Sequence, residues 1–113
     1  MILAALFLSA AVQQVTPETM QLAQTHDRCM TTFAVRLSKE TTDDEAIFEQ
    51  AQAGCAELEQ ALDARLDADL GPDHAPALKA QLEVAAKPNF LAMLDRIRRD
   101  RAAREPSFEG EAQ

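Results

Sequence analysis

The chain of 113 residues has no tryptophan, no tyrosine and only three glycines. Because Gly54, Gly71 and Gly110 lie far apart, they cannot form the glycine-rich loop that cradles a phosphate group. None of the serines lies near a histidine in a strand-to-helix turn, the usual setting of a nucleophilic serine. A C-x-x-C-H motif for covalent haem is also missing. These absences favour a protein that is not an enzyme and has no cofactor.

Alanine, leucine, glutamate, glutamine and arginine dominate the composition, and all of them favour helices. Aromatic residues make up only 4% of the chain, so the core must rely on close packing of helices around alanines. The sequence therefore predicts one all-α domain over residues 16–105. We expect a small helical bundle built on a disulfide-clasped antiparallel helical hairpin, followed by one or two C-terminal helices.

The first eleven residues, MILAALFLSAA, form an uncharged apolar run. The run is shorter than the roughly 20 residues that span a bilayer, but it resembles the apolar part of a secretory signal peptide, with Ser9 and Ala11 suited to cleavage. No lysine or arginine precedes the run, which departs from the usual signal peptide. The alternative is that the segment extends the first helix. We expect a signal peptide over residues 1–11 and a periplasmic or secreted protein.

Cys29 and Cys55 are the only cysteines in the chain. In an exported protein an even number of cysteines is usually paired, so the sequence predicts a disulfide between them. Two alternatives stay open. His26 lies one helical turn before Cys29, so the three side chains could hold a zinc ion, or the two thiols could be buried without pairing.

The first helix is expected over residues 16–38. Thr16 is suited to cap it, and Pro17 and Glu18 are typical of a first turn. Apolar residues, Cys29 and His26 then recur at helical spacing on one stripe. The stripe consists of Leu22, His26, Cys29, Phe33 and Leu37.

A second helix is expected over residues 42–70. Thr42 and Glu45 match a capping box at its start, and Gly71 followed by Pro72 ends it. Its apolar stripe consists of Ile47, Ala51, Cys55, Leu58, Leu62 and Leu66. When the two stripes are folded together with Cys29 facing Cys55, Leu22 faces Leu62, His26 faces Leu58, Phe33 faces Ala51 and Leu37 faces Ile47. This agreement favours the disulfide-clasped hairpin over the two alternatives.

Two further helices are expected, over residues 74–87 and 89–104. Asp73 is suited to cap the first of them, and Pro88 should end or kink it because proline lacks a backbone donor. The remaining residues, 106–113, have no hydrophobic periodicity and are expected to be a disordered tail.

The charge distribution divides the chain, whose formal net charge is −8. Eleven acidic residues against Arg65 alone lie between Glu40 and Asp73. Five arginines follow, and they are candidates for partner binding: Arg96, Arg98, Arg99, Arg101 and Arg104. An acidic protein is a poor nonspecific ligand of nucleic acid, but a basic helix can contact an acidic protein or, less favourably, anionic lipid headgroups. The alternative is that the last helix packs along the acidic second helix.

The alternating aspartates Asp67, Asp69 and Asp73 suggest part of a calcium loop. The match fails at its sixth position, where Pro72 replaces glycine, and at its twelfth, where Leu78 replaces glutamate. We therefore expect no metal ion at these residues or at His26. The favoured interpretation is an exported, noncatalytic protein that binds a protein or envelope partner through charged surfaces. A metal-binding or metal-buffering periplasmic protein is the alternative, and an enzyme of unknown type is a remote one.

Overall fold

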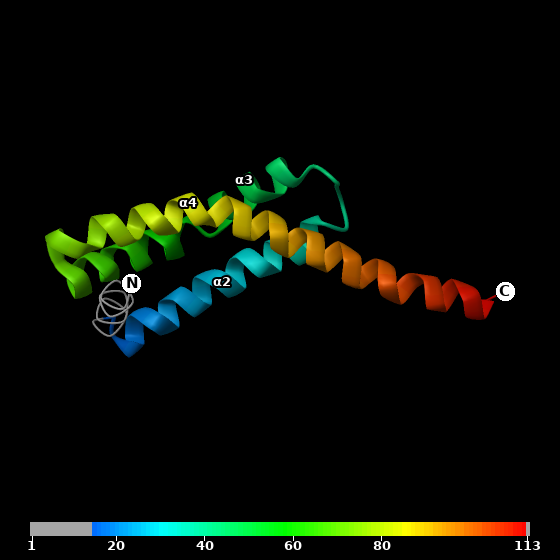
Figure 1. Cartoon of the computed structure of the whole chain (residues 1–113), viewed down its shortest axis with the longest axis horizontal. Coiled ribbons are helices and arrows are strands. Elements are labelled where there is room, and N and C mark those ends of the chain that lie inside the picture. Colours follow the sequence, from blue (N-terminus) through cyan, green and yellow to red (C-terminus); the bar gives the residue numbers. More distant parts are fainter. Residues whose placement is uncertain (1–14, 113) are drawn as a thin grey trace, which may run out of the picture.

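The computed structural model describes residues 15–112, so the predicted signal peptide at 1–11 lies outside the described residues. Three helices follow one another, α2 (Pro17–Leu37), α3 (Asp44–Gly54) and α4 (Ala56–Ala112), and residues 15–112 contain no strand (Figure 1). The prediction of an all-α fold is confirmed. Gly71 divides α4 into a first arm, residues 56–70, and a second arm, residues 72–112.

The chain forms a hairpin that then turns once more at Gly71. α2 runs one way, α3 and the first arm run back beside it, and the second arm returns alongside both (Figure 1). We call the end with the 38–43 connection the loop end and the end with Gly71 the turn end. The second arm continues past the loop end, which gives the molecule extents of 61 × 34 × 23 Å.

The start of α2 is as expected, because Thr16 accepts a hydrogen bond from the backbone N–H of Thr19 at 3.3 Å and Pro17 opens the first turn. The start of α3 differs by one residue from the prediction. Asp43, not Thr42, is its N-cap and accepts from the N–H of Ala46 at 3.2 Å. The predicted cap at Thr42 is therefore wrong, since the aspartate one position later satisfies the exposed donor.

The predicted helix over 42–70 is two helices. Cys55 separates α3 from α4 with φ −108° and ψ 13°, outside helical geometry. Its N–H still donates to the carbonyl of Ala51 at 3.0 Å, and its own carbonyl accepts from Glu59 at 3.1 Å. The helical geometry is therefore interrupted at Cys55, the residue whose side chain is bonded to Cys29 of α2.

Gly71 turns the chain at the other end. Its φ of 74° and ψ of 176° lie in a region that is open to glycine and strained for other residues. The predicted stop at Gly71 is confirmed. Gly71 is the only residue of α4 with nonhelical backbone angles, so the second arm begins at Pro72, ahead of the predicted cap at Asp73.

The second arm does not break at Pro88, in contrast to the predicted helices over 74–87 and 89–104. Pro88 removes the donor to the carbonyl of Val84, but Val84 is 79% exposed and water can satisfy that carbonyl. Packing of Phe90 and Leu94 on the other face holds the backbone straight through the site.

The second arm also continues through Pro106 to Ala112, where the sequence predicts a disordered tail over 106–113. Pro106 has no N–H to donate to the carbonyl of Ala102. Because Ala102 is exposed, water can satisfy that carbonyl. Residues 106–112 therefore extend the projecting helix.

Two apolar clusters hold the helices together. The larger one, at the loop end, contains Ala34, Leu37, Ile47, Phe48, Ala51, Phe90 and Leu94. Its aromatic rings, Phe48 and Phe90, lie 5.3 Å apart at 56°. The smaller one, at the turn end, contains Leu66, Leu70 and Ala75. Within the described part of the chain, no helix is long and apolar enough to cross a membrane.

Candidate functional site

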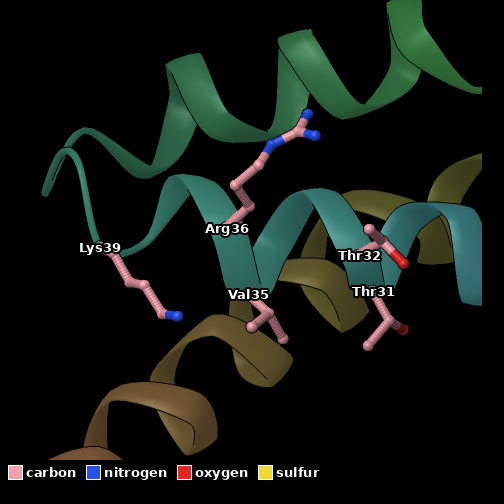
Figure 2. A pocket seen from close by; sticks show the side chains of 5 residues that line it. All are labelled: Thr31, Thr32, Val35, Arg36 and Lys39. Carbon is pink, nitrogen blue, oxygen red and sulfur yellow. The ribbon is translucent and has the colours of Figure 1, made fainter.

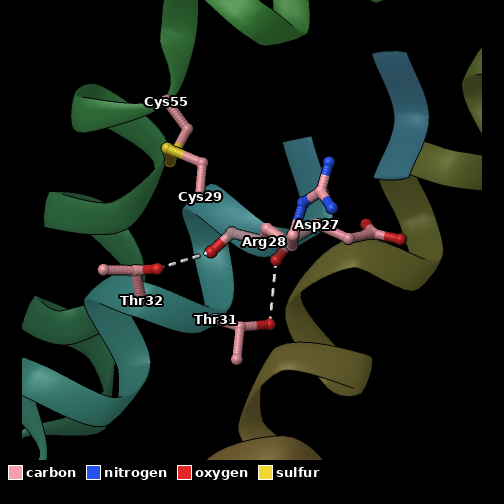
Figure 3. The surroundings of a disulfide bond; sticks show 6 residues. All are labelled: Asp27, Arg28, Cys29, Thr31, Thr32 and Cys55. Atoms are coloured by element: carbon pink, nitrogen blue, oxygen red, sulfur yellow. Dashed lines mark hydrogen bonds between the residues drawn. A yellow bond between two sulfur atoms is a disulfide. The ribbon is translucent and has the colours of Figure 1, made fainter. Parts of the chain in front are cut away.

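The predicted disulfide is present and joins α2 to the junction of α3 and α4 (Figure 3). The Cα atoms of Cys29 and Cys55 lie 6.0 Å apart, within the range that a disulfide spans without moving the backbone. Cys55 is buried and Cys29 is half-buried. The predicted clasp between Cys29 and Cys55 is therefore confirmed.

The zinc alternative is wrong, because both sulfur atoms are consumed in the disulfide and neither can act as a thiolate ligand. His26 is half-buried on α2, one turn before Cys29, as expected. Neither Cys29 nor Cys55 can therefore join His26 as a metal ligand. What remains at this position is a covalent staple.

The carboxylate of Asp69 lies at the turn end and accepts three hydrogen bonds through one oxygen. The donors are the hydroxyl of Thr19 at 2.6 Å, the N–H of Thr16 at 3.1 Å and the hydroxyl of Thr16 at 3.2 Å. These bonds, that of Thr19 above all, hold the pKa of Asp69 below its ordinary value. Thr19 is 1% exposed, so Asp69 satisfies a buried hydroxyl and fastens the start of α2 to the first arm.

The other candidate metal ligands have different neighbours. Asp67 accepts a 2.7 Å ion pair from Lys79, and this hydrogen bond raises the pKa of the lysine. Asp73 is exposed on the second arm, beyond the turn. Among residues 15–105, no three or more histidine, cysteine, aspartate and glutamate side chains come together in a way that could hold a metal ion.

Three of the charges on the second arm pair with acids of α3 and the first arm. Lys87 contacts Glu45 at 2.5 Å, Lys79 contacts Asp67, and Arg98 contacts Asp44. The alternative of internal charge complementarity thus describes part of the surface. Two of these three pairs are made by lysines, which were not predicted as contact residues from the sequence.

The five candidate arginines divide by their contacts. Arg98 also donates to the carbonyl of Thr41, and Arg101 donates to Ser38 and to the carbonyl of Val35, so both fasten the second arm to the loop end. Arg99 pairs with Asp95 on its own helix at 2.9 Å. Arg104 is exposed and has an interaction of its own. Arg96 is exposed and is the member of the set that projects into solvent without a partner among residues 15–105.

A shallow groove of about 350 Å³ lies where the last turns of α2 pass the second arm (Figure 2). Its lining residues are Thr31, Thr32, Val35, Arg36 and Lys39. Figure 2 shows Val35 pointing toward the second arm and Arg36 reaching toward α3. Arg101 of the second arm donates to the Val35 carbonyl at 3.4 Å.

The floor of this groove is apolar despite its threonines. The hydroxyls of Thr31 and Thr32 donate inward, to the carbonyls of Asp27 and Arg28, each at 2.8 Å (Figure 3). Their methyl groups are left beside the half-exposed Val35, and their oxygens can only accept. The groove therefore pairs an apolar floor with a cationic rim.

Arg36 and Lys39 supply that rim, and Phe33 positions the first of them. The guanidinium of Arg36 lies 4.8 Å from the centre of the Phe33 ring, a cation–π contact. Lys39 follows the helix, its N–H bonded to the carbonyl of Arg36 at 3.3 Å. Such a pair can bind carboxylates.

Comparison with known proteins gives no relative: no family model, no curated protein and no solved structure matches the chain. Any function must therefore be argued from the residues themselves.

Neither the groove nor the Asp69 contacts were predicted from the sequence. Val35 lies off the apolar stripe of its helix, and an apolar residue off that stripe is the pattern that could have indicated an exposed apolar floor. Thr16, Thr19 and Asp69 fall on facing turns of the antiparallel register, so the register that found the disulfide could also have found this hydrogen-bond cluster.

Proposed function

We propose that this chain is an exported, noncatalytic binding protein that takes an acidic segment of a protein or envelope partner into the groove on α2. The supporting observation is the pairing of an apolar floor at Val35 with a rim of Arg36 and Lys39. A segment with one apolar side chain between carboxylates matches both parts, because apolar burial supplies affinity and the cations select the charge.

Export is supported by two independent features. The disulfide is typical of oxidising compartments, and the apolar run at residues 1–11 has the composition of a signal peptide. Mass spectrometry of the protein purified from its native source tests this part. We expect loss of the leader and a mass two hydrogens below the reduced value, whereas an intact leader with two reactive thiols would contradict export.

Binding is tested with fluorescent peptides in an anisotropy titration. A peptide with leucine between glutamates should bind, and the same peptide with lysines in place of glutamates should not. The double variant Arg36→Glu/Lys39→Glu should lose binding at least tenfold, since two favourable contacts become repulsive. Arg65→Glu, a charge reversal at a residue paired with Glu18 toward the turn end, is the matched control.

The proposed groove is wrong if the acidic and basic peptides bind equally, or if the control reversal weakens binding as much as the groove reversal. Raising the salt concentration should weaken binding of the acidic peptide to the wild-type protein, because the charges of the rim are exposed to solvent and are screened by salt.

A further inference from the structure

The sequence that follows the last arginine of α4 has the pattern that the groove on α2 would bind. Residues 105–113 contain one aromatic residue, Phe108, and they contain no lysine or arginine. Three glutamates surround the aromatic residue in the sequence: Glu105, Glu109 and Glu111. We call residues 105–111 the acidic segment. It belongs to the ligand class proposed for the groove, an apolar side chain between carboxylates.

A second stretch of the chain has a similar pattern but is part of the bundle. Leu58 lies between Glu57 and Glu59 on the first arm. Its side chain is half-buried, so it would have to leave its own packing to enter a groove on another molecule. The acidic segment is not restricted in this way, because it lies beyond the bundle.

The acidic segment projects from the body of the molecule. Arg101 donates to the carbonyl of Val35 at 3.4 Å, so the second arm passes the groove at that residue. From there α4 continues as a helix to Ala112 and extends past the loop end, away from α2 (Figure 1). Phe108 lies seven residues after Arg101, about 10 Å further along the helix axis. The segment therefore points away from the groove of its own chain and toward other molecules.

The groove has the size and the charge to receive this segment. Its volume of about 350 Å³ is at the small end of ligand sites, so it suits one large side chain. Val35 is 39% exposed and would be covered by an aromatic ring. Among residues 15–105, the side chains of Arg36 and Lys39 form no hydrogen bond or ion pair, so their charges are available to carboxylates.

We infer, building on the proposed function, that the groove on α2 binds the acidic segment of a second copy of this chain. Phe108 of one copy covers Val35 of the other, and the neighbouring glutamates contact Arg36 and Lys39. Apolar burial supplies affinity, and opposite charge selects the segment. Because the backbone of the segment is already helical, less order has to be imposed when it binds.

This contact joins two different surfaces, so it is heterologous. Two copies pair when each places its acidic segment in the groove of the other, and further copies add when the exchange is not reciprocal. One aromatic side chain and a few charges make a small contact, so the association is weak and depends on protein concentration. A bound copy fills the groove, so self-association and the binding of an outside acidic partner exclude each other.

An anisotropy titration of the intact protein with a fluorescent peptide of residues 105–113 tests the ligand. The peptide should bind, and its Phe108→Ala version should bind at least tenfold more weakly, because the buried ring is lost. The peptide with leucine between glutamates reports on the groove separately. If that peptide binds and the 105–113 peptide does not, the proposed function stands and this inference is wrong. If neither binds, both are wrong.

Sedimentation equilibrium of the intact protein over a range of concentrations tests self-association. The average mass of the wild-type protein should rise with concentration. The segment reversal, Glu109→Lys/Glu111→Lys, and the groove reversal, Arg36→Glu/Lys39→Glu, should each weaken association at least tenfold, because each brings like charges together. Circular dichroism should show that both variants keep their helix content.

The matched control is Glu57→Lys/Glu59→Lys. It changes the net charge as much as the segment reversal does, at two exposed glutamates on the first arm, and it should associate like the wild type.

Mixing the segment reversal with the groove reversal separates recognition from damage to the fold. The lysines of one variant fit the acidic groove of the other, and the unchanged segment and groove also fit each other. An equimolar mixture should therefore associate, although neither variant does so alone. The proposal is overturned by a wild-type protein that is monomeric at every concentration, by a control that loses association as the segment reversal does, or by a mixture that stays monomeric.

Discussion

The loop end and the turn end of the bundle are stabilised in different ways. At the loop end seven buried residues form one apolar cluster, and two phenylalanine rings contact each other within it. At the turn end only three buried apolar residues cluster, and the buried polar residue Thr19 donates to Asp69. The loop end is held by buried apolar volume. At the turn end hydrogen bonds to the Asp69 carboxylate supplement a small apolar cluster, and Gly71 turns the chain.

The disulfide lies between the two ends and joins the helices there. Cys55 lies at the junction of α3 and α4. In the sequence it follows the α3 residues of the loop-end cluster and precedes the residues that form the turn end. A protein with so few large side chains gains from such a link, since each cluster alone is small. The following substitutions test the contrast, in order of expected effect.

Phe90→Ala should have the largest effect, about 3–5 kcal/mol of unfolding free energy, because it empties the centre of the loop-end cluster. Urea denaturation followed by circular dichroism measures it. The control is Leu82→Ala, at a side chain that is 48% exposed, which should cost much less. Equal losses for the two variants would contradict a loop end that depends on buried volume.

Removing the disulfide with Cys29→Ala and Cys55→Ala together should cost about 3.5 kcal/mol, since the closed loop restricts the unfolded chain. Reduction of the wild-type protein should give a similar loss in the same denaturation experiment. If the reduced protein were as stable as the oxidised one, the clusters at the two ends would suffice without the link.

Much of this fold could be predicted from the sequence where apolar residues are spaced regularly. The stripe through Cys29 and Leu37 specified the face of α2, and matching it to the stripe through Ile47 and Cys55 identified the disulfide. Periodicity succeeds here because burying one face of each helix leaves a single register.

Prediction was weaker where local signals compete. Thr42 and Asp43 can both cap a helix, and only the folded backbone decides between them. Pro88 disfavours a helix locally, but packing of Phe90 and Leu94 outweighs it. The apolar floor at Val35 leaves a signal in the sequence, but the contact of Arg101 with the Val35 carbonyl does not, because the two residues are far apart along the chain.

Gly71→Ala tests the turn end through the backbone alone. A methyl group at Gly71 would meet no atom within 4 Å, so steric contact with neighbours is not the issue. The cost of about 1–3 kcal/mol should come from forcing a non-glycine residue to a φ of 74°. Denaturation measures the loss, and a variant as stable as the wild type would show that the turn can adopt another conformation.

Thr19→Val should cost about 1 kcal/mol at neutral pH, because it keeps the shape of a buried side chain but removes the hydroxyl that donates to Asp69. Thr25→Val is the matched control. It lies on the same helix, and its hydroxyl donates to the carbonyl of Gln21 in a more exposed setting, so its effect should be smaller.

The pH dependence of this variant separates the carboxylate contact from packing. The pKa of Asp69 is lowered in the folded protein, so its contribution to stability is present above the ordinary value of 3.8 and is lost as pH falls through the lower folded value. Thr19→Val removes the largest cause of the shift. Its acid-side loss of stability should therefore be shallower than that of the wild type, whereas Thr25→Val should follow the wild-type curve. Parallel curves for wild type and Thr19→Val would mean that the turn end depends on apolar packing, as the loop end does.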